Sequence, residues 1–304
     1  MGTVHDREKH FDTAAACYRA ACQGGSATGC FNLGILVRDG SGVRADPRAA
    51  FDLFRRACDG GELDGCVTMG MMYEDGEGVA KDPPAAQAAF ERACAAGSTM
   101  GCNDLAAMLS NGRGVSGDAR RAHELLEKAC KSGDAVACAN LGDDYLTGVG
   151  GPRDVGKAFE LYKFACDAGG AKGCTRLAHE NASGKYVPRD DARALELFKR
   201  ACAAGHNAGC AGLGYMLANG RGTPKDVERA LTLYDKACAG GDRDACFNLG
   251  TRLYQGDGVA RDVARAEPFL RRACALGFER ACRRVESCYS TTASHPPDCE
   301  PPFR

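Results

Sequence analysis

The hydrophobic pattern of this chain predicts helices. Apolar residues recur at intervals of three and four, which places them on one face of an α-helix. Residues 62–75, with the sequence ELDGCVTMGMMYED, show this spacing at Cys66, Gly70 and Tyr73, and Gly76 ends the run. We call such a segment helix A. Because Gly70 opposes helix formation by about 1 kcal/mol, we expect a neighbouring helix to pack closely against it.

A second helix, helix B, follows each helix A after a short loop. Asp82 supplies an N-cap oxygen, and Pro83 takes the first helical position, where a missing N–H does no harm. Helix B then runs through AAQAAFERACA, with Ala86 and Phe90 on its inner face, and Gly97 follows its end. Large residues at the position of Phe90 are expected to fill the space between helix pairs. They are Phe54, Phe90, Tyr162, Phe198 and Tyr234.

The helix pair is repeated without insertion or deletion. Cysteine pairs eight residues apart mark the repeats, and successive pairs are 36 residues apart. The pairs are Cys22/Cys30, Cys58/Cys66, Cys94/Cys102, Cys130/Cys138, Cys166/Cys174, Cys202/Cys210, Cys238/Cys246 and Cys274/Cys282. A period of this length is typical of a solenoid, in which each unit packs on its neighbours. The sequence therefore predicts an all-α fold, an α/α solenoid.

The expected boundaries follow this register. We expect a disordered or tag-like start at 1–10, a solenoid at 11–287 and an irregular tail at 288–304. A half repeat at 11–21 precedes the complete units, and a capping helix begins at 274. The complete units begin at residues 22, 58, 94, 130, 166, 202 and 238.

The spacing of the 19 cysteines favours disulfides over a metal or redox site. Zinc sites prefer ligand pairs two to four residues apart, often with histidine, and a Cys-x-x-Cys motif is absent. The turn between helix B and the next helix A brings each pair together. We therefore predict eight structural disulfides, each worth about 2.5 kcal/mol. Cys17 is expected to be a buried free thiol, and Cys288 to pair with Cys299.

The disulfides indicate an exported protein, because they persist in oxidising compartments. The start, MGTVHDREKHF, carries no apolar stretch of the kind found in a signal sequence. The first helix B also lacks its helix A, so we expect the start to be trimmed or misassigned. The net charge of −1 offers no bulk attraction for nucleic acid. No apolar run approaches the ~20 residues that membrane insertion needs.

The repeated pattern A-C-x(2)-G-x(3)-G-C-x(2)-L-G resembles the Sel-1-like repeat, a relative of the tetratricopeptide repeat. ACDGGELDGCVTMGMMYEDGEGV and ACAGGDRDACFNLGTRLYQGDGV are similar to the Helicobacter cysteine-rich protein branch. The resemblance covers residues 11 to about 287 and departs at Gly151 and Tyr186. It implies a right-handed superhelix with helix A on the concave side, a secreted or periplasmic location and protein binding. It also implies penicillin binding and weak β-lactamase activity.

No motif in the sequence supports catalysis. Ser-x-x-Lys, Gly-x-Ser-x-Gly and His-Glu-x-x-His are absent, and the six histidines share no register. Lys131-Ser132-Gly133 is similar to the Lys-Thr-Gly element of β-lactamases but falls in an ordinary repeat turn. We therefore predict no catalytic residue, metal or cofactor. A β-lactamase-like hydrolase is an alternative from the resemblance alone, with a lactam or peptidoglycan-like ligand. A mitochondrial intermembrane-space assembly factor is a third interpretation, which the Ala/Arg/Gly-rich composition disfavours.

The binding surface is expected along the helix A positions that face away from helix B. Amides there can clamp a peptide backbone and methionines offer adaptable apolar contact to a protein or peptide partner. The predicted ladder comprises Asn32, Leu36, Thr68, Met72, Asp104, Met108, Asn140, Asp144, Arg176, Glu180, Met216, Asn248 and Arg252. Asp143, Asp144 and Glu180 would form its acidic middle. Basic residues in the last turn of helix B, such as Arg92, are interpreted as a solvated outer face, because acidic residues interleave with them.

Overall fold

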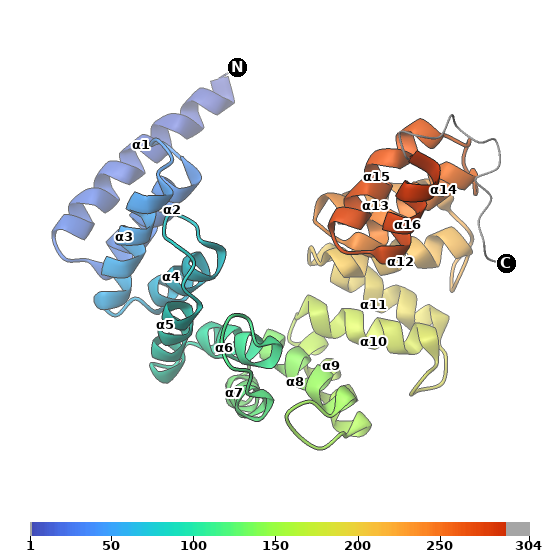
Figure 1. The fold of residues 1–304 in the computed structure, drawn as a ribbon, viewed down its shortest axis with the longest axis horizontal. Helices are drawn as coiled ribbons and strands as arrows, with labels where there is room; N and C mark the ends of the chain where they lie inside the picture. Colours follow the sequence, from blue (N-terminus) through green and yellow to red (C-terminus); the bar gives the residue numbers. More distant parts are fainter. Residues whose placement is uncertain (1, 290–304) are drawn as a thin grey trace. The chain divides into compact units, whose positions relative to one another are not determined.

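A computed structural model describes residues 2–289, with side chains from His10 to Glu286. All regular secondary structure within that range is helical, and the helices follow one another in pairs (Figure 1). The chain divides into two units, Met1–Ala158 and Phe159–Arg304, which are described separately below.

The first unit begins with one long helix and continues in helix pairs. α1 begins at Gly2, so residues 2–10, which we expected to be disordered or tag-like, belong to this helix. The helices are α1 (Gly2–Gln23), α2 (Ala27–Asp39), α3 (Pro47–Asp59), α4 (Leu63–Asp75), α5 (Pro83–Ala95), α6 (Thr99–Asn111), α7 (Ala119–Lys131) and α8 (Ala135–Thr147).

The second unit repeats the same pairs. α9 (Val155–Asp167) crosses the division between the units. It is followed by α10 (Ala171–Ser183), α11 (Asp191–Ala203), α12 (Asn207–Asn219), α13 (Val227–Ala239), α14 (Arg243–Gln255), α15 (Val263–Ala275) and α16 (Glu279–Tyr289). The even-numbered helices from α2 to α14 are the predicted A helices, and the odd-numbered helices from α3 to α15 are the B helices.

Local sequence signals set the helix ends. The Asp82 carboxylate accepts a hydrogen bond from the Ala85 N–H at 3.0 Å, and Pro83 opens α5 as expected. Helix α4 ends at Gly76, whose φ of 76° lies in the left-handed region that side chains disfavour. An aspartate N-cap at the start of helix B and a left-handed glycine at the end of helix A recur from pair to pair. They explain the constant helix length.

Three aromatic B-helix residues fill space that a glycine leaves open on the preceding A helix. Phe54, Phe90 and Tyr234 are almost fully buried. A Cβ at Gly70 would lie 2.6 Å from the Phe90 ring, and a Cβ at Gly214 would lie 2.9 Å from the Tyr234 ring. This confirms the expectation that close packing offsets the poor helix propensity of the internal glycines.

Disulfides join α1 to α2 and each B helix to the helix that follows it. The structure contains all eight bridges that the spacing predicts, with Cα–Cα distances between 4.4 and 4.7 Å. The bridges are Cys22–Cys30, Cys58–Cys66, Cys94–Cys102, Cys130–Cys138, Cys166–Cys174, Cys202–Cys210, Cys238–Cys246 and Cys274–Cys282. The prediction of eight structural disulfides is therefore confirmed.

The predictions for the other cysteines have different outcomes. Cys17 has no disulfide partner but is exposed, so the prediction of a buried thiol is wrong. Leu53, which occupies the same register position in α3, instead packs against Cys22, Cys30 and Ala57. The expected Cys288–Cys299 bridge lies outside the described residues.

Arginines near the end of the B helices connect successive repeats. Arg92 donates to the Cys58 carbonyl at 2.8 Å and pairs with Asp59 at 2.9 Å. Arg56 donates to the Cys22 carbonyl at 2.9 Å, and Arg200 makes the same bond to the Cys166 carbonyl. These residues are therefore more than a solvated face, because each one satisfies a carbonyl at the end of the preceding B helix.

Candidate functional site

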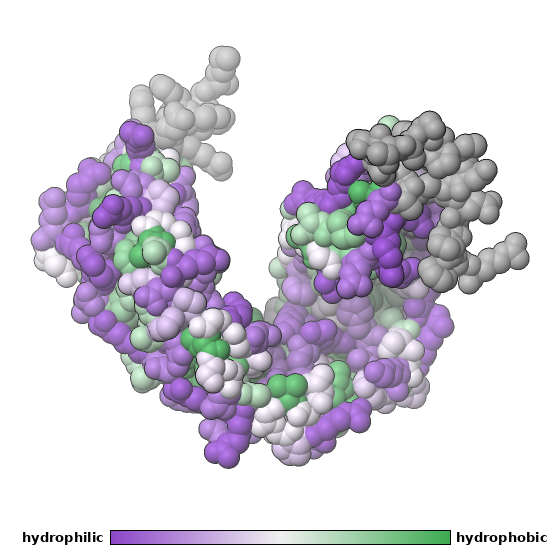
Figure 2. Space-filling model, viewed as in Figure 1, coloured by the Kyte–Doolittle hydropathy of each residue, from purple (hydrophilic) through white to green (hydrophobic). Residues whose placement is uncertain are grey.

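The A helices expose one strip of side chains, which we call the A face. In α2 it runs through Thr28, Asn32, Ile35 and Asp39, at helical spacings of three and four. The equivalent residues of the other A helices are likewise exposed or half-buried, except the buried Gly212. Figure 2 shows that hydrophobic residues break the largely hydrophilic surface only in small patches.

One position of the predicted ladder is wrong. The residues equivalent to Leu36 are buried, apart from the half-buried Glu180, and so do not face solvent. Leu36 and Met72 belong to one apolar cluster with Leu33 and Phe54, so this position packs A helices together. The buried members are Leu36, Met72, Met108, Asp144, Met216 and Arg252.

The remaining ladder positions do reach the surface. Asn32, Thr68, Asp104, Asn140 and Asn248 are half-buried, and Arg176 is exposed. The position that sequence reasoning missed lies one residue before the buried one. It is occupied by Ile35, Met71, Ala107, Asp143, His179, Tyr215 and Thr251. The residue type at this position differs in every repeat, whereas the residue before it is always glycine or alanine. This contrast in the sequence could have identified the exposed position.

The paired cysteines belong to the scaffold beneath the A face rather than to the face itself. The second cysteine of each bridge is the fourth residue of its helix, at the end of the first turn. Those of the A helices are buried, namely Cys30, Cys66, Cys102, Cys138, Cys174, Cys210 and Cys246, whereas Cys282 of α16 is half-buried. Because each sulfur is held in a bridge, these residues supply neither a nucleophile nor a metal ligand. They fix the start of each A helix instead.

Asp104 on the A face of the first unit and the neighbouring Glu74 share one cation. Arg113 pairs with Glu74 at 3.3 Å. Burial and the nearby Glu74 carboxylate raise the pKa of Asp104 to about 6, while Arg113 opposes the rise. The negative charge of this pair is therefore only partly compensated within the chain.

A contact with a buried histidine removes Asp144 from the proposed acidic middle. His123 Nδ1 lies 3.3 Å from Asp144 Oδ2, and both residues are more than nine-tenths buried. The His123 ring also meets the Tyr145 ring edge to face at 4.9 Å. Asp143 is half-buried on the A face, whereas Asp144 serves the packing of α7 against α8.

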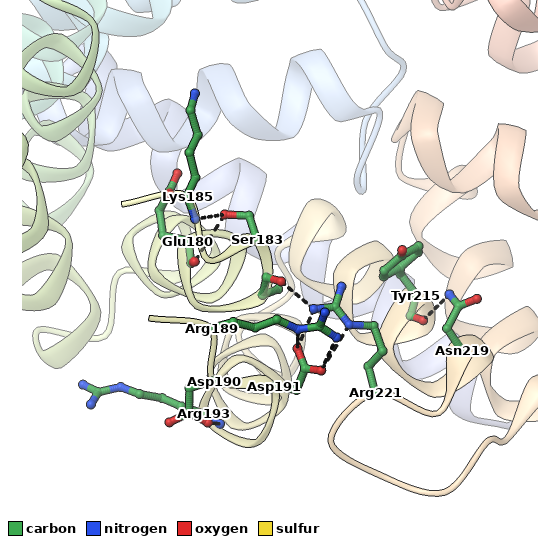
Figure 3. Close-up of polar contacts among 11 residues, drawn as sticks. Glu180, Ser183, Lys185, Arg189, Asp190, Asp191, Arg193, Tyr215, Asn219 and Arg221 are labelled. Carbon is green, nitrogen blue, oxygen red and sulfur yellow. Dashed lines mark hydrogen bonds and ion pairs between the residues drawn. The ribbon is translucent and has the colours of Figure 1, made fainter. Parts of the chain in front are cut away.

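In the second unit, an arginine clamp fixes the start of α11 (Figure 3). Arg189 donates to the Asp191 carboxylate at 2.6 Å and 3.0 Å, and Arg221 binds the same carboxylate. These bonds hold the pKa of Asp191 well below its usual range. Arg221 also lies 5.8 Å from the Tyr215 ring, which is 46% exposed. The clamp orders the loop beside the exposed tyrosine.

Glu180 occupies the otherwise buried ladder position in α10. It is half-buried, and its Oε2 atom is buried without a hydrogen bond. Burial raises the pKa of this carboxyl above its usual value. Glu180 therefore lies at the edge of the A face with an incompletely solvated charge.

The comparison with protein-family models identifies the repeat. A model described as the Sel1 repeat matches residues 27–62, 64–98, 99–134, 135–170, 171–206, 207–242 and 243–278. The chain belongs to the Sel1 repeat family. With its eight disulfides it is a cysteine-rich Sel1 repeat protein, and these bridges indicate an oxidising, exported environment.

Solved structures show the same repeat. A Sel1 repeat protein from Oxalobacter formigenes is 25% identical with a TM-score of 0.61, and the match covers 92% of this chain and 81% of that one. A protective antigen of uropathogenic Escherichia coli with an SLR fold is 26% identical with a TM-score of 0.60. That match covers 92% of this chain, which spans 60% of the length of the antigen.

A third solved structure is related in sequence over part of the chain. Helicobacter pylori cysteine rich protein B is 32% identical, and the match covers 43% of this chain and 94% of that one, with a TM-score of 0.35. Among curated proteins, none matches the chain. None of the helices in the described part of this Sel1 repeat protein is long and apolar enough to cross a bilayer.

The element similar to Lys-Thr-Gly is part of the Sel1 repeat turn. Ser132 follows the last residue of α7, and its hydroxyl donates to the Lys128 carbonyl at 3.2 Å. The backbone N–H groups of Ser132 and Gly133 bond to carbonyls of the same helix. This segment therefore ends a helix, as its place in an ordinary turn predicts.

One Sel1 repeat departs from the others in the loop between its A and B helices. In the first unit, Gly78 and Gly114 pack against the first turn of an earlier B helix, where a Cβ would clash with atoms of Pro47 and Pro83. Tyr186 replaces this glycine in the second unit. Beside it lies an open cavity of about 690 Å³, bordered by Phe159 and Val187 among others. The larger side chain prevents the tight contact that glycine allows.

Proposed function

We propose that this chain is an exported Sel1 repeat scaffold that binds a protein or peptide partner through its A face. The proposal depends on a contrast within the chain. Most buried positions, although not that of Met72, keep one residue class from repeat to repeat, as at Gly34, Gly70 and Gly214. The exposed position beside them instead carries a different residue in each repeat, from Met71 to Tyr215.

Solvation alone does not require such variety, because one polar residue would serve equally well in every repeat. A row of different side chains on rigid helices provides a distinct contact at each repeat, as recognition of a specific partner needs. The position of these side chains is fixed by the disulfide and glycine contacts beneath them. The scaffold thus presents a preorganised surface, which reduces the entropy lost on binding.

The eight disulfides support a secreted or periplasmic location for this binding. The E. coli relative is called a protective antigen, which fits an exported role for this chain. An exported scaffold of this kind would act on partners outside the cytoplasm.

Site-specific photo-crosslinking tests the proposal. In the test variants a photoreactive residue replaces Met71 or Tyr215 on the A face. In the matched controls it replaces Arg55 or Lys199, which are exposed on the B helices. The crosslinkers are activated in an envelope fraction of the source cells, and adducts are resolved by mass. We expect discrete adducts from Met71 or Tyr215 and none from the controls. Equal labelling from both faces would contradict the proposal.

A further inference from the structure

We infer that the A face of the first unit binds a basic segment that also carries apolar side chains. This inference rests on the proposed function and specifies the chemistry of the partner. It follows from the charges of the A helices, from three exposed apolar side chains and from the environment of Asp104.

Acidic residues are concentrated on the A helices of the first unit. The only basic residue in α2, α4, α6 and α8 is Arg38. Their acidic residues are Asp39, Asp64, Glu74, Asp75, Asp104, Asp143 and Asp144. The B helices α3, α5 and α7 together carry eight basic and five acidic residues, although α5 has one of each. The net charge is therefore negative on the A helices and positive on the B helices.

Two of these acids form no ion pair with the residues that the structure describes. Asp39 pairs with Arg38 at 2.9 Å, and Asp144 lies at hydrogen-bond distance, 3.3 Å, from His123. Asp64 and Asp75 are exposed, and no ion pair is formed by either within the described residues. A partner that supplies Lys or Arg side chains would complement these charges, whereas an acidic partner would be repelled.

Exposed apolar side chains lie in the same strip. Met71, Met100 and Val136 are 48%, 53% and 49% exposed. Met71 follows Asp64 by two helical turns, so both lie on one side of α4. Met100 and Val136 occupy equivalent positions in adjacent repeats. Exposed apolar groups beside charges mark interaction surfaces, and methionine adapts to varied partners.

The surroundings of Asp104 explain why a cation would be favoured at this point of the A face. The carboxyl is half-buried between Glu74 and Asp134, which both disfavour its charge, and Arg113 is the cation that counteracts them. A Lys or Arg of the partner placed here would stabilise the ionised carboxylates. Because the site is partly shielded from water, this attraction is screened less than one between exposed groups.

The arrangement favours an extended polypeptide over a metal ion. The acids are spread over four helices, and no cluster of three or more metal-ligating side chains occurs among the described residues. Adjacent helix axes lie about 8–10 Å apart. Four A helices therefore extend over about 30 Å, which matches an extended segment of about ten residues.

Fluorescence anisotropy with the full chain and defined peptides tests this inference. The probe is a labelled ten-residue peptide of alternating Lys and Leu, compared with Glu/Leu and Lys/Ser peptides of equal length. We expect binding of the Lys/Leu peptide only, with affinity that falls as salt rises. Asp64→Lys with Asp75→Lys is expected to weaken binding by about tenfold.

Matched variants make the result specific to the A face. Asp52→Lys with Glu124→Lys makes the same charge change on exposed B-helix positions and is expected to leave binding within twofold of the unmodified chain. Met71→Ser with Met100→Ser is expected to weaken binding without changing net charge. Equal losses in the A-face and B-helix charge variants, or equal binding of the Lys/Ser peptide, would overturn the inference.

The proposed function can survive that failure. If a partner still crosslinks to Met71 after Asp64→Lys and Asp75→Lys, the A face binds a partner but not through a basic segment. If a photoreactive residue at Met71 or Tyr215 gives no adduct even without the charge substitutions, the proposed function itself fails.

Discussion

The two units repeat the same packing between helices but present different A faces. In the first unit the charged residues of the A helices are mostly acidic, and Met71 and Met100 are exposed on the same helices. In the second unit basic residues outnumber acidic ones, and the exposed apolar group is Tyr215. The basic residues there are Lys172, Arg176, Arg243 and Arg252, and the acidic ones are Glu180 and Asp244. The charge of the exposed strip therefore differs between the units, whereas the glycine–aromatic contacts and the disulfides beneath it are repeated.

Removing one disulfide in each unit should produce the largest effect. Cys58→Ala with Cys66→Ala, and Cys238→Ala with Cys246→Ala, each release a short closed loop. We expect a loss of about 2.5 kcal/mol in the free energy of unfolding in either unit. Urea unfolding with hydrogen exchange locates the loosened repeats. A large loss in one unit and none in the other would contradict this repeated packing.

Glycine replacements should have the next largest effect. In Gly70→Ala and Gly214→Ala the new Cβ meets an aromatic ring that is buried in the core. We expect each change to destabilise the protein by about 1–3 kcal/mol, as overpacking does. Thermal unfolding measures the loss. The control is Gly70→Ala in a Phe90→Leu background, since Leu126 takes the place of the ring opposite Ala106, and an equal loss in that background would exclude the ring contact as the cause.

Loss of the arginine contacts between repeats should have a smaller effect. Arg56→Ala and Arg200→Ala leave the carbonyls of Cys22 and Cys166 without these donors. Because the sites are partly exposed, we expect a loss of about 1 kcal/mol in each unit. Chemical denaturation measures it, with Arg55→Ala as an exposed control in the same helix. A loss at Arg55 equal to that at Arg56 would point to helix propensity rather than to the carbonyl bond.

The sequence predicts the scaffold better than the surface. Strict periodicity locates Asp82, Gly70 and the cysteine pairs, because these residues act within one turn or one helix pair. One position of the exposed strip was predicted at Leu36 but lies at Ile35. Helical spacing alone cannot distinguish the two, because it places both on the side away from helix B. Contact between neighbouring A helices, which buries Met72, depends on how repeats stack.

Two other errors have the same origin in contacts between repeats. Register places Cys17 with Leu53, but Cys17 is exposed, whereas Leu53 packs against Cys22 and Cys30 of the preceding disulfide. Arg92 is like any basic residue near a helix end, and only the stacked structure places its guanidinium at the Cys58 carbonyl. Local signals therefore predict the helix pair, whereas the functional surface depends on packing between pairs.

Protonation should give the smallest effect, and it should have opposite signs in the two units. The pKa of Asp104 is raised to about 6 by burial and Glu74, so its ionisation opposes folding. That penalty is absent below about pH 4 and complete above pH 6. Asp104→Asn should therefore stabilise the chain at pH 7, by less than about 1 kcal/mol given the partial exposure, and change little at pH 4.

Asp191 should behave in the opposite way, because Arg189 and Arg221 hold its pKa well below the usual range. Its contribution to stability is present above the unfolded pKa and is lost only as the pH falls through the lower folded pKa. Asp191→Asn should thus destabilise the chain at pH 7 and remain destabilising at pH 5. Urea midpoints measured from pH 4 to pH 7 separate the two variants. Parallel pH profiles would show that the acidic and clamped carboxylates do not differ, and would remove the electrostatic basis for assigning a cationic partner to the first unit alone.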